Sequence, residues 1–124
     1  LTSVLNRRGF LTELREIIDA NIGKNAVMFY CDIDNLKSIN DYYGHSEGDF
    51  AINAISKILK SSVRTGDIIG RMGGDEFTVF TISHDDSEAL MKIKDRIAEN
   101  CQEILAKGGI IEPTLFIKEY FHGK

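Results

Sequence analysis

The chain has 124 residues, which is enough for one domain with a single hydrophobic core. Hydrophobic residues make up 43% and charged residues 27% of the sequence, so an intrinsically disordered chain is excluded. Its 15 Lys and Arg against 19 Asp and Glu give a formal charge of -4. That balance excludes the basic surface of a duplex nucleic-acid binder and is compatible with an acidic metal site.

The sequence offers no candidate for a membrane-spanning segment or a signal peptide. Residues 26–31 form the longest apolar run, which is far too short to span a bilayer, and the first residues do not resemble a signal peptide. We therefore expect no membrane segment in this chain and a cytoplasmic location, which leaves open a membrane anchor elsewhere in the parent protein. Because Leu1 stands where a starting Met would, we expect a piece of a longer protein. Cys31 and Cys101 are expected to be buried, reduced thiols.

A helix and a buried strand are predicted at the start of the chain. Phe10 and Leu14 lie on one face of a predicted helix over residues 8–21, and Gly23 follows as a stop signal. Residues 26–31 are apolar at every position, which is typical of a strand that is buried on both faces. A buried helix segment has the same pattern, but the short length and the Val and aromatic content favour the strand.

The second long helix is predicted from about residue 49 to residue 62. It follows a short turn-helix and a loop at residues 43–45. Apolar residues at helical spacing form its core stripe. Ser46, three residues before Asp49, resembles the start of a capping box. Gly66 follows the helix as a breaker.

A β-hairpin is predicted over residues 67–72 and 76–82. Both segments are rich in Ile, Val, Phe and Thr, and two glycines followed by an aspartate join them. This combination is a strong hairpin signal. The hairpin contributes an antiparallel pair to the expected sheet.

The last part of the chain predicts a third long helix and a final strand. The helix is expected from residues 85–87 to about residue 107, closed by Gly108 and Gly109. The strand is expected from about residue 114 to residue 120. Taken together, the elements predict an α/β (α+β) sandwich with a central mixed or antiparallel sheet that is flanked by helices.

Acidic side chains stand where predicted strands end. Asp32 and Asp34 come directly after the buried strand, and Asp75 lies at the tip of the hairpin. If the hairpin pairs beside that strand, Asp32 and Asp75 converge at one edge of the sheet. Converging carboxylates repel one another unless a cation binds, and oxygen-only ligands favour Mg²⁺ or Mn²⁺ over zinc. The alternative is that Asp32 and Asp34 cap a short helix that begins near Asn35.

Residues 73–77, Gly-Gly-Asp-Glu-Phe, resemble the signature loop of the GGDEF family, the diguanylate cyclases of bacterial signalling. Three further stretches resemble the other motifs of this family, in the same order. They are Leu1-Thr2-x-x-Leu5-Asn6-Arg7-Arg8, Asp32-Ile33-Asp34-x-Leu36-Lys37 and Asn40-Asp41-x-x-Gly44-His45-x-x-Gly48-Asp49. The resemblance covers about residues 1–107 and leaves a tail, 108–124, unmatched. It implies one palm-like nucleotidyl-cyclase domain over residues 1–124 that is incomplete at its C-terminus.

The resemblance also implies a reaction. Members of the family condense two GTP molecules into cyclic di-GMP with loss of two pyrophosphates, using Mg²⁺ (or Mn²⁺). Each domain holds one GTP, so the active unit is a homodimer of antiparallel domains. A sensor or receiver domain is expected before the GGDEF domain in the parent protein.

By resemblance, Asp32, Asp75 and the main-chain carbonyl of Ile33 are the metal ligands. Asp75 and Glu76 are the catalytic pair, in which Asp75 acts as, or positions, the base for the attacking 3′-hydroxyl. Phosphoryl transfer needs the metal to screen the triphosphate and to orient the in-line attack.

A substrate-binding set is implied as well. Amides at a helix start would cradle the β- and γ-phosphates, and two side chains would hydrogen-bond the guanine edge and so select against adenine. The set is Asn35, Leu36 and Lys37 at the phosphates, Asn40 and Asp49 at the guanine, and His45 and Gly74 beside them. Taken singly, these residues have ordinary alternatives: a solvated lysine, a turn asparagine, a first-turn carboxylate on the helix dipole and a loop histidine.

Arg64-Thr65-Gly66-Asp67 resembles the family's inhibitory product site. There the arginine binds guanine or phosphate with two donors, and the aspartate accepts from a guanine edge. The alternative is a surface Arg–Asp pair at a helix end, which contributes little to stability.

Three hypotheses remain open because residues 108–124 lack the family's final lysine and arginine. The first is a diguanylate cyclase domain whose metal and guanine motifs are intact but which turns over poorly in this form. The second is a catalytically inactive GGDEF module that binds GTP or cyclic di-GMP and signals through a partner. The third is another palm-like nucleotidyltransferase with a different substrate, which the guanine motif and the Arg64–Asp67 stretch disfavour.

Overall fold

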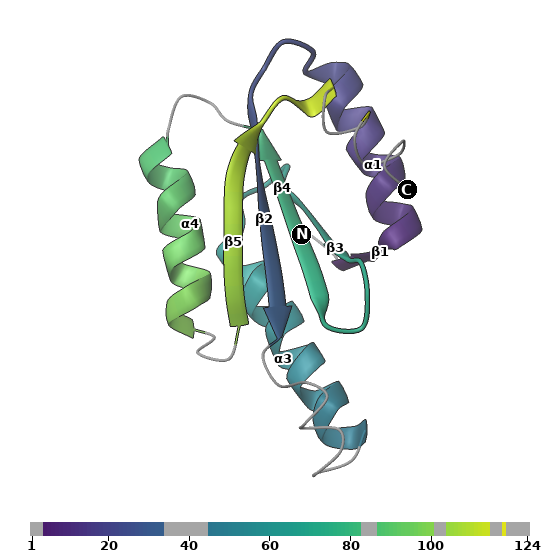
Figure 1. Ribbon diagram of the computed structural model, residues 1–124, viewed down its shortest axis with the longest axis vertical. Coiled ribbons are helices and arrows are strands. Elements are labelled where there is room, and N and C mark those ends of the chain that lie inside the picture. Colours follow the sequence, from purple (N-terminus) through teal and green to yellow (C-terminus); the bar gives the residue numbers. More distant parts are fainter. Residues whose placement is uncertain (1–3, 34–44, 83–86, 101–103, 115–117, 119–124) are drawn as a thin grey trace.

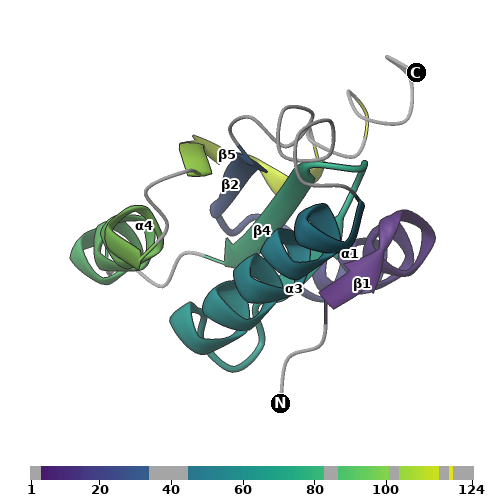
Figure 2. The same cartoon turned by 90° about the horizontal axis from the view of Figure 1, so that it is seen from below.

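The computed structural model describes residues 4–33, 45–82, 87–100, 104–114 and 118. Its five strands form one mixed sheet in the order β1-β3-β4-β2-β5, with α1 on one face and α3 and α4 on the other (Figures 1 and 2). The elements are β1 (Val4–Asn6), α1 (Arg7–Ala20), β2 (Ala26–Ile33), α3 (His45–Ser62), β3 (Ile68–Arg71), β4 (Glu76–Ile82), α4 (Ser87–Asn100) and β5 (Ile104–Ile111). β1 pairs with β3 in parallel, and the other neighbours are antiparallel. The predicted α+β sandwich with a mixed sheet is therefore confirmed.

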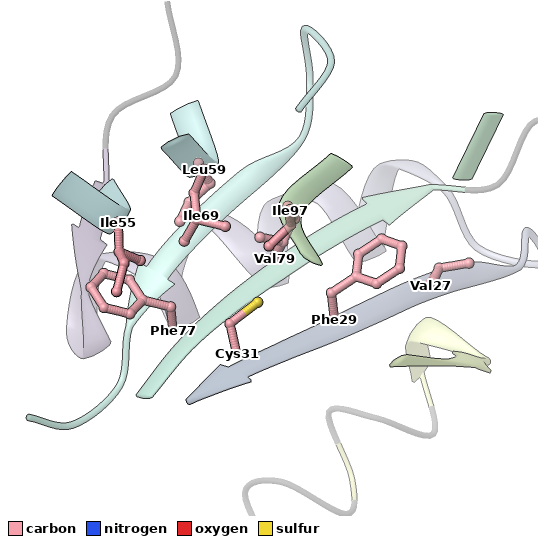
Figure 3. Packing of buried hydrophobic residues seen from close by; sticks show 9 residues of the cluster. All are labelled: Val27, Phe29, Cys31, Ile55, Leu59, Ile69, Phe77, Val79 and Ile97. Atoms are coloured by element: carbon pink, nitrogen blue, oxygen red, sulfur yellow. The ribbon is translucent and has the colours of Figure 1, made fainter. Parts of the chain in front are cut away.

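Strand β2 is buried on both faces, as its unbroken apolar run predicts. Val27, Phe29 and Cys31 point toward α3 and α4, where they pack with residues of β3 and β4 (Figure 3). Ala26 and Met28 alternate with them and pack beneath α1. Because successive side chains of a strand point to opposite faces, the two core clusters together need apolar residues at 26–29 and at 31. Tyr30 is exposed and belongs to neither cluster. Cys31 is buried, as expected, and Cys101 lies outside the described residues.

Helix α1 packs closely on β3. Its N-cap is Asn6, whose side-chain Oδ1 accepts a hydrogen bond from the Gly9 amide at 2.8 Å. Phe10 is fully buried and lies directly over Gly70, where a Cβ would come within 2.6 Å of the phenyl ring. Only a glycine at position 70 lets the helix approach the strand so closely.

The predicted hairpin is present and pairs beside β2, as the convergence of acidic residues requires. The Met72 amide donates to the Glu76 carbonyl at 2.8 Å and closes the turn between β3 and β4. Strand β4 then pairs along its whole length with β2. The turn thus lies at the edge of the sheet where β2 ends (Figure 1).

The sequence misplaces the end of the third helix. α4 ends at Asn100, and Ile104, which the predicted helix to about residue 107 includes, begins β5. Gly108 and Gly109 do not close a helix but lie inside β5, opposite Phe29 and Met28. The backbone of β2 needs a hydrogen-bonded partner on its second side, and this long-range pairing overrides the local helical spacing.

Three smaller boundaries also differ. α3 begins at His45, in the predicted loop, so Ser46 lies inside the helix and not at its cap. Strand β1, which the sequence did not predict, is only three residues long and exists through its parallel pairing with β3. Residues 113, 114 and 118 are helical, so the predicted strand over 114–120 is wrong where the structure describes it. The short helix expected after residue 34 lies outside the described residues. Within the described part of the chain, no helix combines the length and the apolar character that crossing a membrane requires.

Candidate active site

Two carboxylates face each other across β2 and β4. Asp32 is the register partner of Glu76. Directly opposed residues of antiparallel strands share a face of the sheet, with Cβ atoms roughly 4.5–5.5 Å apart, and like charges in that arrangement repel. Asp32 is partly buried, and among the described residues no Lys or Arg forms an ion pair with it or with Glu76. The pair is therefore a place where a bound cation would relieve repulsion.

Asp75 lies at the same edge, in the turn immediately before β4. Its side chain is exposed, and its chain neighbour Glu76 is the residue opposite Asp32. The described residues contain no group of three His, Cys, Asp or Glu side chains arranged to hold a metal. A ligand set of Asp32, Asp75 and the main chain of Ile33 stays a prediction. Ile33 is the last residue of β2, and its backbone pairs with Ile104 of β5.

The two turn glycines leave bare main chain beside these carboxylates. Neither Gly73 nor Gly74 has a positive φ, and a Cβ on either would meet nothing within 4 Å. Both residues are exposed. Neither the turn conformation nor packing inside the chain therefore requires glycine here. A ligand that approaches the backbone would explain the absence of side chains.

Arg71 holds this turn, although no motif in the sequence points to it. Its Nε donates to the Gly73 carbonyl at 3.3 Å, and its Nη2 donates to the Gly74 carbonyl at 3.1 Å. Arg71 is the last residue of β3 and is exposed. The only signal in the sequence is an arginine two positions before the glycine pair.

The predicted substrate residues are only partly within the described chain. Asp49 is exposed in the N-terminal part of α3, and His45 is the first residue of that helix. The remaining positions expected at the phosphates and at the guanine edge lie outside the described residues. They are Asn35, Leu36, Lys37 and Asn40.

Arg64 and Asp67 form a connected corner between α3 and β3. The Arg64 amide donates to Asp67 Oδ2 at 2.8 Å, and the Asp67 amide donates back to the Arg64 carbonyl at 3.1 Å. Arg64 Nη2 donates to Thr81 Oγ1 at 2.6 Å and to the Ile82 carbonyl at 3.2 Å. The Asp67 side chain is only 5% exposed, so the pair is not the solvent-exposed one of the alternative interpretation. Arg64 ties this corner to the end of β4.

A groove of about 610 Å³ opens at this corner, and we call it the Arg64 groove. Residues 63–68 line one side, together with Lys60 from α3. Glu13 and Glu16 of α1 line the other side. One side of the groove therefore carries Lys60, Arg64 and Asp67, and the side from α1 is acidic.

Comparison with known proteins decides the family. The family model described as "Diguanylate cyclase, GGDEF domain" matches residues 1–115. The chain belongs to the GGDEF family. The match continues beyond residue 107, into the region that the sequence motifs leave unassigned.

Curated relatives of this GGDEF domain are diguanylate cyclases by name. The chain is 46% identical over 81 residues to the probable diguanylate cyclase DgcC of Escherichia coli K12, a match that covers 64% of this chain and 22% of that protein. It is 30% identical over 101 residues to the diguanylate cyclase DgcP of the same organism, which covers 80% of this chain and 29% of that protein. The GGDEF domain thus spans less than a third of the length of these relatives.

Solved GGDEF domains share its fold. The GGDEF domain of YfiN from Pseudomonas aeruginosa superposes with a TM-score of 0.77 at 26% identity, covering 98% of this chain and 88% of that one. A microbial GGDEF domain that was described for its interaction with cyclic di-GMP superposes with a TM-score of 0.74 at 29% identity, covering 96% and 81%.

Proposed function

We propose that this GGDEF domain condenses two GTP molecules into cyclic di-GMP, with release of two pyrophosphates. One observation carries the proposal: the β2–β4 register sets Asp32 opposite Glu76, with Asp75 next in the chain, at the edge where the bare glycine turn lies. The names of the curated relatives support the same activity. A cytoplasmic location stays a prediction.

Mg²⁺ (or Mn²⁺) fits the residues at this edge. The available donors are carboxylate and carbonyl oxygens, which these hard cations prefer. Two facing carboxylates without a cationic partner among the described residues also favour a cation. Asp32, Asp75 and the Ile33 carbonyl would hold the metal, with Glu76 beside them. When bound, the metal would screen the charge of the triphosphate.

The side chains of the domain would then bind and orient the substrate. Gly74 would let the nucleotide approach the main chain, because no side chain stands in the way. Asp75 would accept, or help to position, the proton that leaves the attacking 3′-hydroxyl. Since each domain would hold one GTP, the reaction requires a second copy of the domain to bring the other nucleotide in line.

Selectivity for guanine would come from α3 and the segment before it. Asp49 is exposed and can accept from the ring N–H and the exocyclic amine of guanine, together with Asn40. His45 would line the same pocket. Amides of residues 35–37 would bind the β- and γ-phosphates.

Product would bind in the Arg64 groove. The Arg64 side chain is 30% exposed and its guanidinium has five N–H donors, so it would contact a ligand as well as β4. Asp67 would accept from a guanine edge. The solved GGDEF domain that interacts with cyclic di-GMP makes this ligand the reasonable choice.

A second candidate is a GGDEF module that binds GTP or cyclic di-GMP without turnover. Two observations favour it: a groove lined by Arg64 and Asp67 is present, and the described residues hold no three-ligand metal cluster. In that case the domain would signal through a partner, with no role for the facing carboxylates in chemistry.

Incubation of the chain with GTP and Mg²⁺, followed by chromatography of the products, distinguishes the two candidates. We expect cyclic di-GMP from the wild type and none from Asp75→Ala. Asp19→Ala, a change at an exposed aspartate of α1, should behave as the wild type. If the wild type binds cyclic di-GMP but consumes no GTP, the second candidate is correct. Turnover by Asp75→Ala at the wild-type rate would remove Asp75 from the mechanism.

A further inference from the structure

The turn between β3 and β4 has little inside the chain to hold its shape. One main-chain hydrogen bond, from the Met72 amide to the Glu76 carbonyl, closes it at 2.8 Å. Gly73 and Gly74 have no side chains, and the space where a Cβ would stand is open for 4 Å around each. Consecutive glycines have the widest range of backbone conformations and lose the most entropy when ordered. Asp75 follows them directly, so the position of its carboxylate depends on how well this turn is fixed.

Arg71 supplies the missing restraint. Its guanidinium binds two successive carbonyl oxygens, those of Gly73 and Gly74, at 3.3 and 3.1 Å. The guanidinium is planar and rigid, so two donors on it fix the relative orientation of two peptide planes. Both carbonyls are exposed and water could satisfy them. The two Arg71 hydrogen bonds therefore serve to order the turn, since neither carbonyl would be left without a hydrogen-bond donor in their absence.

We propose that Arg71 is a positioning residue: it orders the glycine turn that carries Asp75, at the edge of the sheet where Asp32 pairs with Glu76. This inference rests on the proposed function, in which Asp75 is a metal ligand. The register gives the reason that order matters, because Asp32 and Glu76 are fixed by the β2–β4 pairing whereas Asp75 lies outside both strands. A cation shared by these groups needs all of them held in place before it binds.

Lysine is the informative substitution at position 71. Arg71→Lys keeps the charge and most of the length but offers a single ammonium in place of a two-donor plane. It should therefore release one carbonyl and loosen the turn while leaving the field of the cation unchanged. Arg8→Lys is the matched control. Arg8 is an exposed arginine in the first turn of α1, two residues after Asn6, which pairs with Arg71. Among the described residues it is Arg71, and not Arg8, that donates to the turn carbonyls.

The first measurement needs neither GTP nor metal. Backbone ¹⁵N relaxation of the 124-residue chain reports the order of the Gly73, Gly74 and Asp75 amides. We expect their heteronuclear NOE values to lie close to those of the flanking strands in the wild type and in Arg8→Lys, and to fall clearly in Arg71→Lys. The melting temperature should be unchanged in all three chains, because Arg71 is exposed. A turn that is equally ordered with Lys at position 71 overturns the inference.

The second measurement is a titration with Mn²⁺ alone, in which the free ion is counted by electron paramagnetic resonance. Arg71→Lys should weaken Mn²⁺ binding by about tenfold, the lower end of the effect of removing a residue that orients a metal ligand. Asp75→Asn should weaken it further, and Arg8→Lys not at all. An Arg71→Lys chain with wild-type Mn²⁺ affinity overturns the positioning role. If the wild type binds no Mn²⁺, the proposed metal site is wrong, and the relaxation data alone decide whether Arg71 orders the turn.

Discussion

Replacing Gly70 with alanine tests the close packing of α1 on the sheet. A Cβ at position 70 would lie 2.6 Å from Cδ1 and Cγ of Phe10 and 2.8 Å from its Cβ, closer than real Cβ contacts come. Phe10 is completely buried in the core cluster beneath α1, where Leu14 lies beside it, so its ring cannot turn out into solvent. The helix or the strand would have to shift.

The expected loss of stability follows from this overlap. Inserting a methyl group into a well-packed core typically costs about 1–3 kcal/mol. For a chain of this size, each kcal/mol lowers the melting temperature by roughly 3–5 °C. Gly70→Ala should therefore melt roughly 3–15 °C below the wild type, with a lower urea midpoint and an unchanged m-value.

Gly109→Ala is the matched control. Gly109 also lies in a strand, opposite Met28, but a Cβ there would meet nothing within 4 Å. Alanine should be neutral or slightly stabilising at this position, within about 0.5 kcal/mol of the wild type, because it restricts the unfolded chain. Urea unfolding followed by circular dichroism measures both variants. If Gly70→Ala unfolds at the same midpoint as Gly109→Ala, then Phe10 of α1 does not pack directly over Gly70 of β3.

Three further changes test the site. Gly74→Ala should leave the melting temperature within about 2 °C of the wild type, since a Cβ there would meet no other atom within 4 Å. It should nevertheless abolish cyclic di-GMP formation in the chromatographic assay. Full activity would show that no ligand approaches the turn. Arg64→Ala should relieve inhibition by cyclic di-GMP without lowering the initial velocity. It should also lower the free energy of unfolding by about 1–3 kcal/mol, because it removes the contacts with Thr81, Ile82 and the buried Asp67. Inhibition that persists in a folded variant would rule out the Arg64 groove as the product site. Thr81→Val should lower the stability by about 1 kcal/mol but leave that inhibition intact, because it removes one of the two β4 partners of Arg64 and leaves the guanidinium in place. Loss of inhibition would mean that the contact with Thr81, and not the guanidinium itself, forms the site.

The sequence predicts the centre of the fold well because the decisive patterns there are local. Six consecutive apolar residues admit few structures other than a strand buried on both faces, and β2 is that strand. Gly-Gly-Asp between two β-rich segments predicts the hairpin, which is present. The sequence predicts acidic residues at one edge on the condition that the hairpin pairs beside that strand. β4 does pair with β2, and this brings Asp32 and the hairpin to the same edge.

The errors come from interactions that are distant in sequence. The spacing of apolar residues continues from α4 into residues 104–111, so no local signal marks where the helix stops and β5 begins. What makes β5 a strand is its pairing with β2, whose residues Ala26 to Ile33 lie about 70 to 85 positions earlier in the chain. Arg71 was missed for a related reason: an exposed arginine at a strand end has no distinctive pattern, and its role appears only when the turn carbonyls are placed.

The central claim is that the acidic groups of β2 and of the glycine turn share one cation next to the nucleotide. Anomalous diffraction from crystals grown with Mn²⁺ and a non-hydrolysable GTP analogue tests it directly. The account predicts a Mn²⁺ peak in contact with carboxylate oxygens of both Asp32 and Asp75, with the phosphates of the analogue beside it. A nucleotide bound in the crystal with no Mn²⁺ peak between these two residues, or with the ion held by other side chains, would contradict it.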